Sequence, residues 1–258
     1  MLKKKVMRYD EIVSLTQELF EYHYNSSYIY SKYLRRMVGR GQLKRVRRGL
    51  YVALSPVEDE PSVDKLLIAS KIRSEYFLGY HTALEFYGCA YSAQNEAYIC
   101  VRPEKRFDPF EFRQFRFRPV RVHDINTEVE KKNYRGHILC VSGRERTFID
   151  CLDKVEYAGG WEEALKSLQN LGGLDFEKIE GLTIEADSDI LLRKVGIVLE
   201  LLKDRSMFYE HLHDEILVRL AETVSEQTRY LIRGVPGSLN PRWRLYIPEG
   251  FEDKLIGV

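Results

Sequence analysis

The sequence predicts an α+β fold with a small N-terminal domain and a larger mixed α/β domain that has a small sheet and a helical second half. Near the N-terminus, apolar residues recur at helical spacing and are followed by two short strand-like segments. A proline-containing acidic stretch, SPVEDEP, then interrupts the pattern. Beyond it, strand-like segments give way to long amphipathic ones. We therefore expect domains at 1–54 and 62–258, joined by a linker at 55–61.

The first domain is predicted to contain three helices and two strands, at residues 8–16, 16–22, 27–38, 42–46 and 49–54. Ile12, Leu15 and Leu19 have helical spacing. Polar residues from Asn25 can cap the third helix, and Gly39 can end it. The order of helix, helix, turn, helix and hairpin is that of a winged helix-turn-helix domain.

The second domain is predicted to begin with two helices, at 63–72 and 81–88, and three strands, at 97–101, 115–122 and 137–142. The middle strand alternates Phe115 and Phe117 with Arg116 and Arg118. The polar segment NTEVEKKNYRG predicts a loop. The remaining chain predicts helices at 144–153, 161–169, 175–182, 189–203 and 208–224, and strands at 228–234 and 242–248.

The charge of the chain is unevenly distributed. The net charge is only +1, yet residues 1–55 carry 12 Lys or Arg against four Asp or Glu. From Lys32 to Arg48 there are eight basic residues and no acid. A basic segment on a mildly acidic body indicates a polyanion-binding surface.

The third helix concentrates this charge on one face. At 100° per residue, its packing face carries Ile29, Tyr30, Tyr33, Leu34, Met37 and Val38. The opposite face and the hairpin supply the predicted DNA-binding residues, which are Ser27, Tyr28, Ser31, Lys32, Arg35, Arg36, Arg40, Lys44, Arg45, Arg47 and Arg48. We expect Lys32 and Arg35 to contact base edges, and Arg45 to Arg48 to contact phosphates. A solvated basic helix is the alternative interpretation.

Other classes of function have little support in the sequence. No apolar run is long enough to span a membrane, and the basic N-terminus lacks the apolar stretch of a signal peptide. The four cysteines lack the spacing of a zinc site. We therefore expect them to be buried apolar side chains in a cytoplasmic protein. No catalytic triad or phosphate-binding loop motif occurs. We expect a cytoplasmic protein that is not an enzyme and has no metal and no cofactor.

Five segments resemble the AbiEi family, the antitoxins of an abortive-infection toxin–antitoxin system that acts in phage defence. They are YLRRMVGRGQLKRVRRGLY (33–51), YFLGYHTALEFYG (76–88), GRERTFIDCLDKVEYAGGWEEALKSL (143–168), DILLRKVGIVLELL (189–202) and NPRWRLYIP (240–248). The resemblance implies a winged helix that binds operator DNA and represses its own operon. It also implies that the second domain helps to neutralise a nucleotidyltransferase-like toxin, without implying that the two proteins form a stable complex.

Three alternatives stay open. Arg144, Arg146 and Asp150 form either a surface for the toxin or RNA, or an ion pair that fixes their helix to the sheet, and the ion pair is preferred. Asp124, Glu130 and Lys132 follow the order of a nuclease metal site, but the loop around them argues against one. The second domain of a stand-alone repressor would instead bind a small-molecule effector.

Overall fold

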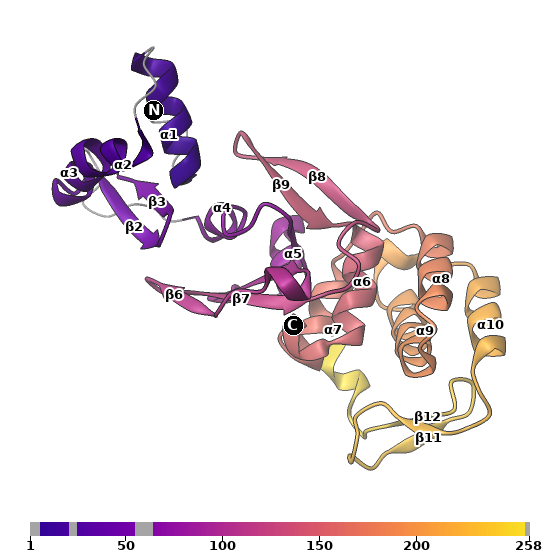
Figure 1. Cartoon of the computed structure of the whole chain (residues 1–258). Coiled ribbons are helices and arrows are strands. Elements are labelled where there is room, and N and C mark those ends of the chain that lie inside the picture. Colours follow the sequence, from indigo (N-terminus) through magenta and orange to yellow (C-terminus); the bar gives the residue numbers. More distant parts are fainter. Residues whose placement is uncertain (1–5, 21–24, 55–63, 256–258) are drawn as a thin grey trace.

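The computed structural model describes residues 6–20, 25–54 and 64–255 as a mixed α+β protein of helices and several sheets (Figure 1). The predicted linker at 55–61 and the end of the second predicted helix lie outside these ranges. Within them, no helix combines the length and the apolar character that crossing a bilayer requires. The α+β class predicted from the sequence is confirmed.

The N-terminal unit combines a three-stranded sheet with a run of helices. Its elements are β1 (Val6–Arg8), α1 (Tyr9–Phe20), α2 (Ser26–Ile29), η1 (Tyr30–Leu34), α3 (Arg35–Gly39), β2 (Leu43–Arg47) and β3 (Leu50–Ala53). The sheet is antiparallel in the order β1-β3-β2. Strand β1 was not predicted, because three residues are too few for an alternating pattern. The two helices predicted at 8–16 and 16–22 are wrong: one helix, α1, runs through both, and Thr16 Oγ1 donates to Ile12 O within it.

A π-helical turn, η1, changes the phase of the third predicted helix. The Arg35 N–H donates to Tyr30 O, five residues earlier, so this turn is wider than an α-helical turn. Ile29 and Leu34 are buried as predicted, whereas Tyr30 and Val38 are 46% and 37% exposed. The prediction that Tyr30 and Val38 pack inward, which assumed a regular α-helix, was therefore wrong.

A six-stranded mixed sheet follows. Its unit contains α4 (Lys65–Ala69), β4 (Phe77–Leu78), α5 (His81–Tyr87), β5 (Glu96–Val101), η2 (Pro103–Lys105), β6 (Phe110–Phe112), β7 (Phe115–Arg121), β8 (Val129–Tyr134) and β9 (His137–Ser142). The strand order is β6-β7-β5-β4-β9-β8. Strands β5 and β7 are parallel, as are β4 and β9. The predicted loop in NTEVEKKNYRG was wrong, because most of it forms β8, an edge strand whose charges hide the strand pattern.

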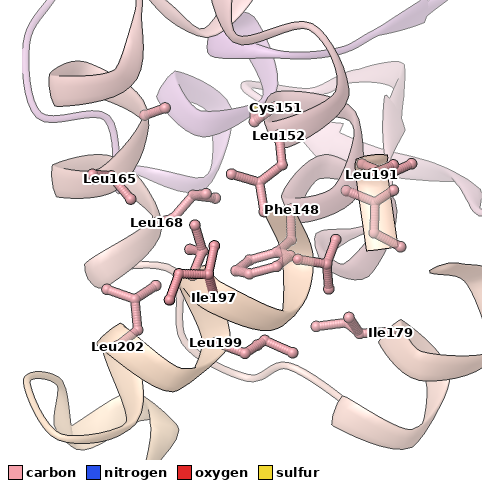
Figure 2. Close-up of a cluster of buried hydrophobic side chains, with 14 of the residues drawn as sticks. Phe148, Cys151, Leu152, Leu165, Leu168, Ile179, Leu191, Ile197, Leu199 and Leu202 are labelled. Atoms are coloured by element: carbon pink, nitrogen blue, oxygen red, sulfur yellow. The ribbon is translucent and has the colours of Figure 1, made fainter. Parts of the chain in front are cut away.

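The second half is helical and ends in a small sheet. Its elements are α6 (Arg144–Asp153), η3 (Val155–Ala158), α7 (Trp161–Gln169), α8 (Phe176–Glu185), α9 (Asp189–Lys203), η4 (Met207–Tyr209), α10 (Asp214–Thr223), β10 (Arg229–Tyr230), β11 (Ser238–Asn240), β12 (Leu245–Ile247) and η5 (Glu252–Leu255). Figure 2 shows how Phe148 of α6, Leu165 of α7, Ile179 of α8 and Leu199 of α9 meet in one apolar core. Helix α10 begins at Asp214, later than predicted.

The N-terminal unit packs directly against the six-stranded sheet unit. Val46 and Leu50 belong to the same buried apolar cluster as Leu67 of α4. An ion pair reinforces this contact, with Lys71 Nζ 2.5 Å from Glu11 Oε1 of α1. The N-terminal unit and the six-stranded sheet unit therefore share one buried apolar cluster.

Candidate nucleic-acid interface

Six basic side chains of the N-terminal unit are exposed and form no ion pair with any residue that the structure describes: Arg35, Arg36, Arg40, Lys44, Arg45 and Arg48. They come from two adjoining elements, helix α3 with the residue that follows it and the β2–β3 hairpin (Figure 1). In a chain with as many acids as this one, such basic side chains are available for an external anion.

The hairpin turn depends on a glycine. Gly49 has a φ of +79°, a conformation that glycine adopts without steric cost. Arg48 directly precedes it and is exposed, while Leu50 directly after it is buried. A bulge between Arg45 and Arg47 shifts the register of β2 against β3. The turn thus projects Arg48 away from the core.

The helical run from α2 through η1 to α3 carries hydroxyls and rings in its N-terminal half. Ser27, Tyr28, Ser31 and Lys32 are exposed, as predicted for a contact surface. The Lys32 ammonium donates to the Tyr28 hydroxyl and lies 4.8 Å from the centre of the Tyr28 ring. This cation–π contact orders Lys32 on the helix surface.

Arg47 does not belong to the exposed basic group formed by the six residues of α3, the residue after it and the hairpin. Its guanidinium lies 4.8 Å from the ring centre of Phe110 and 5.6 Å from that of Phe107. Burial lowers the pKa of Arg47, and nearby Arg73 lowers it further. Arg47 was predicted to contact DNA, but the structure places it at the junction with the sheet unit. Sequence alone gives no signal for this difference between Arg47 and Arg48.

The three residues of the possible antitoxin surface do not converge. Arg144 Nη1 donates to Gly172 O at 2.9 Å, and its guanidinium covers the Tyr87 ring. Arg146 turns the other way, with Nε 3.4 Å from Asp150 Oδ2 and Nη2 2.8 Å from Asp124 O. These contacts agree with the preferred interpretation, in which the charges fix α6 to its surroundings.

Asp150 makes folding stability depend on pH. Burial raises its pKa to about 6, although Arg146 lowers it. Because an unfolded Asp titrates near pH ~4, the folded state gains stability from this group below about pH 4 and loses it as the pH rises through about 6. As the pH rises from about 4 to about 7, we expect the free energy of unfolding of Asp150→Asn to increase by roughly 2 kcal/mol relative to that of the wild type. Urea unfolding across this range measures the difference.

The matched control for Asp150 is Asp214→Asn. The ammonium of Lys203 lowers the pKa of the exposed Asp214. A carboxyl with a lowered pKa stabilises the fold above its unfolded pKa, so this variant should lose stability relative to the wild type over the same range. A pH response of the same sign in both variants would contradict the assignment.

The residues of the alternative nuclease site are also separated by their contacts. Asp124 accepts the backbone N–H groups of Asn126 and Thr127, which makes it a turn residue. Partial desolvation alone would raise the pKa of Asp124, but a hydrogen bond from the Thr127 side chain and these backbone bonds lower it. Glu130 on β8 pairs with Lys132. Across the described ranges, no group of three or more His, Cys, Asp or Glu residues is arranged to hold a metal ion.

No known protein family model and no curated protein matches this chain. Among solved structures, the chain is similar to the crystal structure of the RV2827C protein from Mycobacterium tuberculosis, with a TM-score of 0.66 and 14% sequence identity. The match covers 97% of this chain and 88% of that one. The two proteins share a mixed α+β fold along nearly the whole chain, and at this identity the likeness carries the fold alone.

Proposed function

We propose that this protein is a DNA-binding, AbiEi-like antitoxin that represses its own operon. The observation that carries the proposal is the group of six exposed basic residues on α3, the residue after it and the β2–β3 hairpin, which form no ion pair with any described residue. The order of elements in the N-terminal unit supports a winged helix, in which α2, η1 and α3 form the recognition helix and the hairpin forms the wing. Operator DNA is the proposed partner.

The assignment to an antitoxin rests on the resemblance in sequence. Two of the resembling segments pack together, because Trp243 of NPRWRLYIP donates from Nε1 to Glu200 Oε2 of the 189–202 segment at 2.7 Å. A nucleotidyltransferase-like toxin is the second proposed partner. Arg144, Arg146 and Asp150 have internal partners, so we assign the toxin no contact residues.

The test is binding to the upstream DNA of the gene over a range of salt, measured by fluorescence anisotropy. Removing one phosphate contact lowers the slope of log affinity against log salt by about 0.9. We expect Arg48→Ala to show this loss and to weaken specific and unrelated duplexes alike. Arg35→Ala should instead weaken the specific duplex by about tenfold more than the unrelated one, because a base contact discriminates by ~1–3 kcal/mol.

Arg47→Ala is the matched control, since Arg47 lies against Phe107 and Phe110. In this variant, the slope of log affinity against log salt should equal the wild-type value. Salt-insensitive binding by the wild type, or equal effects of Arg47→Ala and Arg48→Ala, would overturn the proposed interface.

A further inference from the structure

A hollow of about 480 Å³ opens between the start of α1, the helical run of α2 and η1, and the β2–β3 hairpin. Its lining residues are Tyr9, Ser27, Tyr30, Arg45, Arg48, Gly49 and Tyr51. This volume lies within the ~300–1,000 Å³ that is usual for small-molecule sites. Ser27, Arg45 and Arg48 also belong to the proposed DNA surface, whereas Tyr9, Tyr30 and Tyr51 do not.

The fold holds the walls of this hollow in place. The Tyr9 N–H donates to Gly49 O at 2.9 Å, which ties the start of α1 to the hairpin turn. The rings of Tyr9 and Tyr30 meet edge to face, with their centres 6.3 Å apart. Tyr51 is 4% exposed and packs in a buried cluster with Leu34 and Leu43. One wall is thus a packed aromatic side chain rather than a mobile surface residue.

The chemistry of the lining is both aromatic and cationic. Arg45 and Arg48 form no ion pair with a described residue, and the lining residues that the structure describes include no acid. Burial raises the pKa of Tyr51, Tyr30 and Tyr9 raise it further, and Arg45 lowers it. Guanidinium groups bind phosphate in a bidentate manner, and aromatic rings stack on planar bases. Tyr30 is 46% exposed, so its ring is accessible to such a base.

We propose that this hollow is a nucleotide site that binds a nucleoside 5′-phosphate, with the phosphate on Arg45 and Arg48 and the base on the tyrosine rings. Two sources carry this chemistry: a free mononucleotide and an unpaired nucleotide at the end of a strand. A free nucleotide bound here occupies Arg45 and Arg48, and therefore competes with duplex DNA for the wing.

Calorimetric titration of the full-length protein with thymidine 5′-monophosphate tests the site without any duplex. We expect binding that is at least about tenfold tighter than that of thymidine or inorganic phosphate, since each of these lacks one half of the contacts. Arg48→Gln and Tyr30→Leu should each weaken binding by about tenfold, while Tyr30→Phe keeps the ring and should retain it. Arg40→Gln is the control, because Arg40 is exposed and outside the lining.

A second arm separates the two sources, using a 5′-phosphorylated single strand and a blunt duplex. If a strand end is the ligand, the single strand binds and Tyr30→Leu weakens it, even where the free monophosphate gives no heat. The proposal is overturned if neither probe binds the wild type, or if Arg40→Gln weakens binding as much as Arg48→Gln. Loss of duplex binding alone would count against the operator function and leave the nucleotide site standing.

Discussion

Replacing Arg193 by methionine is expected to lower the free energy of unfolding by about 3–5 kcal/mol. Arg193 of α9 has no solvent exposure. Its Nε lies 3.0 Å from Asp189 Oδ2, and its Nη1 donates to Arg244 O at 2.7 Å. Its Nη2 donates to both Ser225 O and Ser225 Oγ. Methionine would fill part of the volume but would leave a carboxylate and several carbonyls without this donor.

The control for Arg193 is Arg219→Met on α10. Arg219 also pairs with a carboxylate, with its Nε 2.6 Å from Glu180 Oε1, but half of its side chain is exposed to solvent. Glu180 is itself buried, but Arg219 is half exposed and its described bonds go to this one carboxylate, so we expect the control to cost only about 1–2 kcal/mol. Urea unfolding of both variants gives the comparison. Equal losses in the free energy of unfolding would show that the bonds of Arg193 are not what holds α9 to the C-terminal strands.

Only one part of the Arg193 network has a local pattern in the sequence, and we did not predict the pair from it. Asp189 and Arg193 are four residues apart on a predicted helix, which favours a local pair. The bonds to Ser225 and Arg244 join segments that are far apart in the chain. The same limit applies to the basic surface: composition showed the charge between Lys32 and Arg48, but not that Arg47 lies on Phe107 and Phe110.

Elements with strong local patterns were predicted well, and those set by pairing or strain were not. Helices α6, α7 and α9 match their predicted ranges closely, because apolar side chains recur along them. Strand β8 was missed because its charged residues hide the alternation. Tyr30 is exposed although 100° periodicity placed it on the packing face, and the π-turn η1 that begins at Tyr30 departs from this periodicity. The aromatic half of the proposed nucleotide site therefore had no signal in the sequence.

The same substitution, glycine to alanine, is expected to have opposite effects in two neighbouring helices. In α9, a Cβ on Gly196 would lie 2.1 Å from an atom of the Trp243 ring, which is fully buried. The indole cannot move freely, because its Nε1 donates to Glu200 Oε2 at 2.7 Å. We expect Gly196→Ala to lower the free energy of unfolding by about 1–3 kcal/mol through overpacking.

Gly181 of α8 provides the matched control. No heavy atom lies within 4 Å of the position that its Cβ would take. Alanine is the better helix former, so Gly181→Ala should raise the free energy of unfolding by about 0.5–1 kcal/mol. The close contact of Gly196 with Trp243 joins two segments of the proposed antitoxin resemblance, 189–202 and 240–248. A gain of stability in both variants would show that this contact is loose, and would remove a structural reason for glycine and tryptophan to occur together in these segments.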